Sequence, residues 1–271
     1  MQFVAELRAK PALIAMLHAP PLPGSARSNL APAAVVERVL ADARAAAAGG
    51  ADALLLENYG DAPFSPGRMP PHVIAFLTML ALRVQESVDL PIGVNALRND
   101  ARAALAVALA AGGAFVRVNV LAGVVATDQG LVAGRADRVL AYRRQLGAAI
   151  PILADVDVKH GRPLWGATIG DRAQDLVERA GADALVVTGD ATGRPPDLAD
   201  LEAVRAACPA TPLIVGSGVT AANAGGLLPL ADGAIVGTAL KRGGQVGAPI
   251  DPERVAAVAG AARAAWAGRR E

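Results

Sequence analysis

The chain has 271 residues, of which 53% are apolar and 19% charged, and its 26 basic and 25 acidic residues leave a formal net charge of +1. This length and composition predict one globular domain over residues 1–271. A near-neutral charge does not suit a protein that neutralises many phosphates, so we expect no nucleic acid among the partners.

The compartment is predicted from three features. The longest uncharged apolar stretch, residues 103–116, is too short to cross a bilayer. Glu6 falls where a secretory signal would need an apolar core, and the single Cys208 cannot form an intramolecular disulfide. We therefore expect a cytoplasmic protein without a transmembrane segment.

Eight short apolar segments along the chain are the predicted strands, and the first covers residues 13–17. Four others begin where an Ala-rich run ends in Gly, in the stretches 48–56, 111–116, 180–187 and 231–236. Three follow a Pro directly, in the stretches 91–94, 151–154 and 212–215. Gly ends a helix in the left-handed conformation, and an apolar run after it is typical of a parallel strand buried on both faces.

The intervals between these strands are long enough for helices, and apolar residues recur in them at helical spacing, as at Val35, Val39 and Leu40. Eight strand–helix units in one domain predict an α/β fold, a (β/α)8 TIM barrel. A doubly wound open sheet is the alternative. That fold usually carries a Gly-x-Gly-x-x-Gly turn after its first strand, where this chain has His-Ala-Pro-Pro-Leu-Pro-Gly at 18–24.

Long loops follow the predicted strands at 18–31, 58–71, 121–134 and 159–170, whereas the connections from helix to strand are short. Barrel enzymes place their sites at the carboxyl ends of the strands. We therefore expect this end to be the working face, although long loops can also merely decorate a scaffold.

Polar side chains gather at the predicted carboxyl ends, where a barrel interior is usually apolar: His18, Glu57, Asn95, Arg117, Asn119, Asp155 and Asp157. Strand alternation places Asp155 and Asp157 on one face. A buried Arg117 needs a carboxylate, either Asp155 or Glu57, and the pair could also only hold the strands in register. Carboxylates sharing one cavity have pKa values pushed apart, so Glu57 and Asp157 are candidates for acid and base.

Three further groups follow strand ends. His18 and His160 could move a proton or orient a substrate, or they could be packing and surface residues. Lys159 could form a Schiff base if its pKa were lowered, or simply pair with Asp157 or a phosphate. We expect no obligatory cofactor or metal, although Glu57, Asp155 and Asp157 could hold Mg²⁺.

A phosphate site is predicted after the last two strands. The sequences Val-Gly-Ser-Gly-Val-Thr at 215–220 and Ile-Val-Gly-Thr-Ala-Leu-Lys at 235–241 let backbone N–H groups approach an anion near helix starts. They resemble the phosphate cradle of ribulose-phosphate-binding barrels, and the alternative is simple turn chemistry. The predicted phosphate-binding residues are Gly216, Ser217, Gly218, Gly237 and Thr238.

The stretch 188–196 after the sixth strand is predicted to be a mobile flap over a charged ligand. Its candidate substrate-binding residues are Thr188 and Arg194. On the other side of the barrel mouth, Asn95, Arg117 and Asn119 are expected to orient substrate hydroxyls or the carboxylates.

Several motifs together resemble the BtpA/SgcQ family across nearly the whole chain. They include Leu-Glu-Asn-Tyr-Gly-Asp-Ala-Pro-Phe at 56–64, Ala-Asp-Val-Asp-Val-Lys-His at 154–160, and residues 16–25, 93–100, 117–120, 127–130, 187–189 and 215–220. The resemblance implies a barrel of the ribulose-phosphate-binding type. Position 157 is often His in the family, so the resemblance supports Asp155 more strongly than Asp157.

The resemblance implies two different functions. One family member is described as a putative sugar-utilisation enzyme, and the family takes its name from a cyanobacterial factor for photosystem I accumulation that associates peripherally with membranes. Our first hypothesis is an enzyme that cleaves a glycosidic bond or moves a proton in a phosphorylated sugar or nucleoside, with Glu57 and Asp155 as catalytic residues around the sugar. The second is a non-catalytic assembly factor for membrane complexes such as photosystem I, acting through the apolar segment 62–71. That segment could instead cover the site or form an interface of a homo-oligomer.

Overall fold

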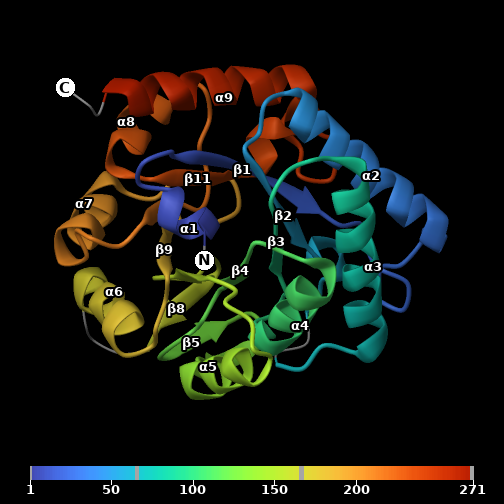
Figure 1. The fold of residues 1–271 in the computed structure, drawn as a ribbon, viewed down its shortest axis with the longest axis horizontal. Coiled ribbons are helices and arrows are strands. Elements are labelled where there is room, and N and C mark those ends of the chain that lie inside the picture. Colours follow the sequence, from blue (N-terminus) through green and yellow to red (C-terminus); the bar gives the residue numbers. More distant parts are fainter. Residues whose placement is uncertain (1, 65–66, 165–167, 269–271) are drawn as a thin grey trace.

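Eight parallel strands close into a barrel in the computed structural model, which describes residues 2–64, 67–164 and 168–268. The strand order around the barrel is β1-β11-β10-β9-β7-β4-β3-β2, and helices surround it (Figure 1). The strands are β1 (Ala12–His18), β2 (Ala53–Glu57), β3 (Ile92–Asn95), β4 (Phe115–Val118), β7 (Ile152–Asp155), β9 (Ala184–Val187), β10 (Leu213–Val215) and β11 (Gly233–Val236). The predicted TIM barrel and its eight strands are confirmed.

One helix precedes β1, one follows β11, and the others lie between strands along the chain. The helices are α1 (Gln2–Glu6), α2 (Pro32–Ala48), α3 (Pro71–Ser87), α4 (Ala101–Ala111), α5 (Ala136–Gln145), α6 (Ile169–Glu178), α7 (Leu198–Ala207), α8 (Ala224–Leu227) and α9 (Pro252–Ala267). Short 3-10 helices occur at η1 (Tyr59–Asp61), η2 (Leu228–Leu230), η3 (Thr238–Leu240) and η4 (Arg242–Gly244). Within the described residues, no helix is long and apolar enough to cross a membrane.

The amino-terminal end of the barrel is closed by apolar side chains. Phe115 is fully buried, and the ring of Phe3 stacks on it with centroids 4.8 Å apart. Gly93 makes room for this ring, because a Cβ at that position would lie 2.1 Å from Phe115. Val4 and Leu7 complete the plug from α1 and the turn after it. The polar residues of the interior are therefore left to the opposite end.

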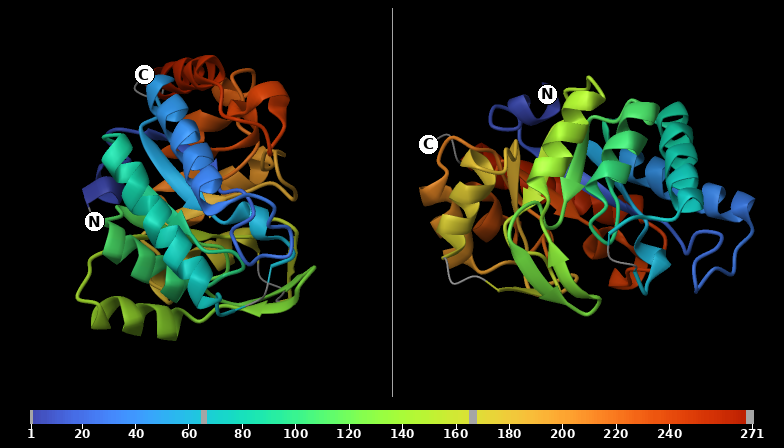
Figure 2. Two further views of the ribbon diagram at one scale, coloured as in Figure 1. Left: turned by 90° about the vertical axis from the view of Figure 1, so that its right-hand side faces the viewer. Right: turned by 90° about the horizontal axis from the view of Figure 1, so that it is seen from below.

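A small sheet of three antiparallel strands stands outside the barrel, in the order β6-β5-β8. Its strands are β5 (Val124–Thr127), β6 (Gly130–Ala133) and β8 (Gly161–Pro163), and they come from the loops after β4 and β7. It lies at the end of the molecule opposite to α1 (Figure 2). The sequence predicts only loops here, because the pairing of β5 with β8 joins segments far apart in the chain.

Candidate functional site

The carboxyl end of the barrel holds a cavity of about 1260 Å³. Strand register explains why polar side chains meet in its wall. His18 lies beside Glu57, Glu57 beside Asn95, and Asn95 beside Arg117 in adjacent strands. These four residues end strands β1 to β4 or lie one position before the end, so parallel pairing brings them to one edge.

Arg117 and Asp155 form a buried ion pair in this wall. The Arg117 Nε and Nη2 atoms donate to the two Asp155 carboxylate oxygens at 2.8 and 2.9 Å. Asn119 Nδ2 donates to the same carboxylate at 2.9 Å. Burial opposes the charge of Arg117, but the adjacent Asp155 outweighs it and raises the pKa of the guanidinium. The carboxylate that the buried Arg117 was expected to need is therefore Asp155.

Glu57 is the second buried carboxyl group of the cavity. Asn95 Nδ2 donates a hydrogen bond to Glu57 Oε2 at 2.6 Å. Burial raises the pKa of Glu57, and the charges of Arg117 and Lys159 only partly oppose this effect. Because its protonated form is favoured, Glu57 can give a proton to a reacting oxygen and take one back.

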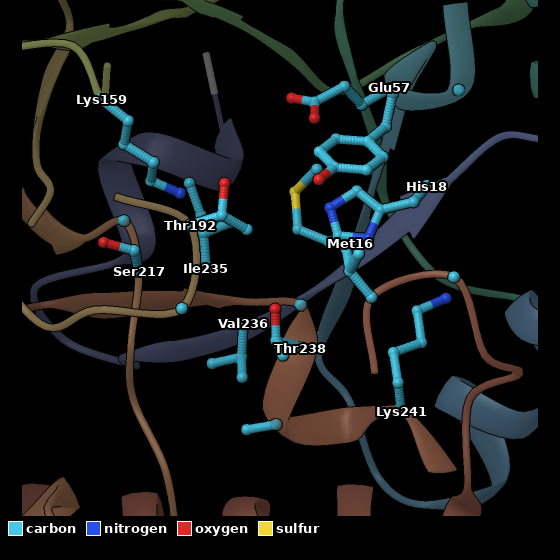
Figure 3. Close-up of a pocket in the computed structure, with 18 of the residues that line it drawn as sticks. Met16, His18, Glu57, Lys159, Thr192, Ser217, Ile235, Val236, Thr238 and Lys241 are labelled. Carbon is cyan, nitrogen blue, oxygen red and sulfur yellow. The ribbon is translucent and has the colours of Figure 1, made fainter. Parts of the chain in front are cut away.

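Lys159 follows β7, and its amine points into the cavity from the side opposite Glu57 (Figure 3). In the described part of the chain, no side chain forms an ion pair or hydrogen bond with its Nζ atom. Burial, followed by the nearby charge of Arg117, lowers the pKa of Lys159 to about 8. A neutral amine is therefore accessible near neutral pH.

Asp157 lies elsewhere than the sequence predicts. Its carboxylate binds Arg172 of α6 through two hydrogen bonds of 2.9 and 2.6 Å, and it is not part of the cavity wall. Strand β7 ends at Asp155, so the alternation that would place Asp157 on the same face stops before it. The predicted pairing of Lys159 with Asp157 is wrong for the same reason.

His18 borders the cavity next to the turn after β11. Its ring lies against Tyr59 with centroids 4.6 Å apart, and a Cβ on Gly237 would lie 2.7 Å from His18 Cε1. Burial, and then the charges of Lys241, Lys159 and Arg117, lower the pKa of His18 to about 3. This shift favours the neutral imidazole at physiological pH, and within the described residues its Nδ1 atom has no hydrogen-bond partner.

His160 lies at the rim of the cavity and is exposed. Its Nε2 atom is 3.2 Å from Thr192 Oγ1, and its backbone N–H donates to the Asp190 carbonyl at 3.1 Å. His160 thus joins the loop after β7 to the loop after β9.

The predicted flap at 188–196 is tied to the turn after β10. The Ser217 hydroxyl accepts from the Gly189 N–H at 2.9 Å and donates to the Arg194 carbonyl at 2.8 Å. Gly218 has a φ of +70°, and a Cβ there would lie 2.0 Å from the Pro195 nitrogen. Because the Ser217 hydroxyl already donates its proton to the Arg194 carbonyl, Ser217 can offer an anion only its backbone N–H.

Three of the predicted substrate-binding residues, Asn95, Thr188 and Arg194, lie outside the cavity wall. Thr192 and Gly193, from the same loop as Thr188 and Arg194, do line it. Thr188 donates to the Asp157 carbonyl at 3.0 Å. The Arg194 residue is exposed, and its backbone carbonyl binds Ser217. The two residues follow the end of β9, where the loop folds back on β10.

The predicted phosphate turns both reach the cavity, whose wall includes Gly216, Ser217, Gly218, Gly237 and Thr238. The helices that follow these turns are short, because α8 has four residues and η3 has three. The contribution of helix dipoles is correspondingly smaller than the sequence suggests, and the backbone N–H groups are the main anion donors that the turns offer.

Five further basic residues that were not predicted as site residues line the cavity: Arg27, Arg38, Arg98, Lys241 and Arg254. Lys241 is buried, and its Nζ atom lies 2.6 Å from Asp42 Oδ2. The available signal was a lysine at the end of the turn after an apolar strand, since Lys241 follows η3. Its partner is 199 positions away, so local sequence could not identify it.

The carboxylates named as possible Mg²⁺ ligands do not converge. Asp155 is held by Arg117 and Asn119, and Asp157 faces Arg172. Within residues 2–64, 67–164 and 168–268, no group of three or more His, Cys, Asp or Glu side chains is arranged to hold a metal ion.

The apolar segment 62–71 lies against the site in its described part. Ala62 and Phe64 line the cavity, and the Arg98 guanidinium lies 5.7 Å from the centre of the Phe64 ring. The Gly67 N–H donates to the Arg98 carbonyl at 3.3 Å. Ser65 and Pro66 of this segment lie outside the described residues.

The fold and the cavity define a TIM-barrel protein with a pocket at the carboxyl end of its strands, lined in part by cationic and other polar side chains. The profile of the BtpA family matches residues 9–264, and the chain belongs to this family. It is 47% identical over 245 residues to the "Photosystem I biogenesis protein BtpA" of Synechocystis, covering 90% of this chain and 85% of that protein.

Other similarities extend over most of the chain as well. An uncharacterised protein of Pyrococcus furiosus is 42% identical over 245 residues, which cover 90% of this chain and 92% of the relative. Among solved structures, thiamine phosphate pyrophosphorylase from Pyrococcus furiosus superposes with a TM-score of 0.58 and 17% identity, covering 96% of this chain and 99% of that one. This last likeness concerns the fold alone.

Proposed function

We propose that the chain is an enzyme that acts on a phosphorylated sugar or nucleoside at the carboxyl end of the barrel. The observation that carries this proposal is the shared cavity. Glu57 and Lys159, both with shifted pKa values, line the same space as the glycine turns after β10 and β11. Perturbed titratable groups facing one another in a cavity are typical of acid–base chemistry.

The division of work follows from the contacts. Gly218 and Gly237 offer backbone N–H groups to a phosphate, and Thr238 adds a hydroxyl. The Gly216 N–H donates to the Val187 carbonyl at 2.7 Å, so Gly216 contributes to the shape of the turn rather than a donor. Glu57 gives or takes the proton in glycosidic cleavage or in proton transfer next to a carbonyl. Asp155 is committed to Arg117 and Asn119, so it holds the wall in place and orients Arg117.

The phosphate anchor is tested by thermal unfolding against phosphate, ribose phosphates, nucleotides and unphosphorylated sugars. A ligand bound by the folded state raises the melting temperature. We expect only phosphorylated compounds to raise the melting temperature. This rise should be lost in Thr238→Asp and retained in Thr238→Asn, because Asn has the shape of Asp without its negative charge. Equal shifts in both variants contradict the anchor. Turnover of the ligands found is then compared between the wild type and Glu57→Gln.

The second candidate is an assembly factor for membrane complexes, which the printed name of the Synechocystis relative suggests. The small outer sheet has an apolar face that supports it. Val124, Leu131 and Leu164 are 37%, 67% and 58% exposed. Strand register places them on one side, because Val124 lies opposite Ala133 and Leu131 opposite Ala126, while the Leu164 N–H donates to the Val124 carbonyl. Exposed apolar faces of this kind serve partner binding.

The two functions are separated by expressing variants in a Synechocystis strain that lacks its relative and measuring photosystem I. An assembly role requires that Leu131→Lys fails to restore photosystem I while Glu57→Gln restores it. An enzymatic role requires the reverse. Leu109→Lys on α4 is the matched control, since Leu109 is 44% exposed and lies away from the small sheet.

A further inference from the structure

We propose that Lys159 is a nucleophile that forms an imine with the carbonyl carbon of a phosphorylated aldehyde or ketone. The inference rests on the proposed function and narrows it, because it names an open-chain carbonyl compound as the substrate class. It is carried by the position of one amine relative to the carboxyl groups around it.

The amine of Lys159 lies in the cavity, and none of the described carboxylates is within ion-pair distance of it. The two carboxylates nearest to it along the chain are engaged elsewhere, Asp155 by Arg117 and Asp157 by Arg172. Among the described residues, none hydrogen-bonds to Lys159 Nζ. A lysine that served only to neutralise a carboxylate would contact one, so this arrangement suits a reactive amine better than a structural cation.

The other lysines of the chain differ in this respect. The sequence contains three lysines, at positions 10, 159 and 241. Lys10 is exposed and follows α1 at the opposite end of the barrel. Lys241 lines the same cavity, but Asp42 binds its Nζ atom at 2.6 Å. Lys159 is therefore the lysine whose amine is both inside the cavity and free of an ion pair.

The electrostatics of the cavity favour the neutral amine. Burial and then Arg117 lower the pKa of Lys159 to about 8. About one tenth of the amine is then unprotonated at pH 7, against roughly one part in 3000 for a free lysine. Attack on a carbonyl needs this lone pair.

Glu57 is placed to move the protons of the reaction, because its carboxyl group faces Lys159 across the cavity (Figure 3). The Lys159 Nζ lone pair attacks the carbonyl carbon, and Glu57 protonates the carbonyl oxygen as the C–N bond forms. Glu57 then regains the proton that the attacking nitrogen loses, which gives the carbinolamine.

The second half of the step releases water. Glu57 protonates the carbinolamine hydroxyl, the C–O bond breaks, and the nitrogen lone pair completes the C=N bond as water leaves. The sum is one amine, one carbonyl and one proton giving one protonated imine and one water. The protonated imine acidifies the adjacent C–H bond, and the carboxylate left on Glu57 accepts that proton.

The test is reductive trapping of the whole chain with borohydride and two probes that differ only in phosphate, glyceraldehyde 3-phosphate and glyceraldehyde. Peptide mapping locates the adduct, and three lysines plus the α-amino group make the assignment simple. We expect one adduct, on Lys159, half-saturating at a concentration about tenfold lower for the phosphorylated probe. Lys10→Arg should trap normally, and Lys159→Arg should not trap in the cavity.

The melting temperature of Lys159→Arg shows whether this variant folds. A second measurement needs no variant: inorganic phosphate should protect Lys159 of the wild-type protein from trapping by glyceraldehyde 3-phosphate. If glyceraldehyde 3-phosphate raises the melting temperature but leaves Lys159 unmodified, the imine is overturned and the phosphate anchor stands. If both probes modify Lys159 equally and phosphate does not protect, the amine is confirmed and the anchor in the proposed function fails. Equal, slow modification of Lys10 and Lys159 overturns the special reactivity of Lys159.

Discussion

Arg117 and Asp155 form a bidentate ion pair in the cavity wall, with nitrogen–oxygen distances of 2.8 and 2.9 Å. Because this carboxylate is committed to the guanidinium, one cation of the wall is neutralised and Lys159 is not. The pair thus removes Arg117 from the charges that a ligand can use and leaves Lys159 among those that remain. Its removal should affect the stability of the barrel before it affects any chemistry.

Asp155→Asn should destabilise the fold strongly, because it leaves the buried Arg117 without a counter-ion. The expected loss in the free energy of unfolding is about 3–5 kcal/mol. Urea unfolding followed by circular dichroism measures it. Asp157→Asn is the matched control, since its pair with Arg172 is partly exposed and should cost about 1 kcal/mol or less. Equal losses in the two variants would contradict the assigned burial.

Glu57→Gln should leave the fold intact and change how stability depends on pH. Burial raises the pKa of Glu57 in the folded chain, so the folded state binds more protons than the unfolded state above the usual pKa of 4.5. Wild-type stability therefore falls as pH rises from there until the folded-state pKa is passed.

The glutamine variant lacks this contribution, so the wild-type minus variant difference in unfolding free energy should decline with pH. Urea titrations at several pH values give this difference. A flat difference from acid to neutral pH would show that Glu57 has an ordinary pKa. Once a substrate is known, the same variant should lose about 10²- to 10⁴-fold in turnover.

The His18 imidazole should remain neutral between pH 8 and pH 5. Its pKa of about 3, lowered mainly by burial, means that the unfolded state binds the proton first as the pH falls below 6.5. His18 therefore costs stability progressively between pH 6.5 and about 3. NMR of the three histidine rings, assigned with His18→Asn, should show no titration of His18 in the upper range. A midpoint near 6.5 would refute the burial of this ring.

Ser217→Ala should loosen the loop after β9 without disturbing the barrel. The Gly189 N–H loses its acceptor and the Arg194 carbonyl loses its donor. A loss of about 1–3 kcal/mol is expected for these part-buried groups. Hydrogen exchange at the Gly189 N–H should accelerate in Ser217→Ala. It should not accelerate in the control Thr238→Val, because the Thr238 hydroxyl binds neither Gly189 nor Arg194. Unchanged exchange in Ser217→Ala would show that other contacts hold the loop.

The sequence by itself determined the barrel. Gly at helix ends and Pro before strands mark the boundaries locally, and runs such as 53–56 and 184–187 are apolar because both faces of a parallel strand are buried. Polar residues at the carboxyl ends, Glu57, Asn95 and Arg117 among them, were also visible, since strand order in a barrel brings neighbouring ends together. Short-range patterns suffice for these features.

Only the tertiary structure decided what each polar group contacts. Because β7 ends at Asp155, Asp157 faces Arg172 and not the cavity. The Ser217 hydroxyl donates to the Arg194 carbonyl in the loop after β9. Lys241 binds Asp42, which lies 199 positions away in the sequence, whereas no described side chain binds the amine of Lys159. These outcomes depend on where loops end in space and on which of several distant charges lies within reach, and no local pattern encodes either.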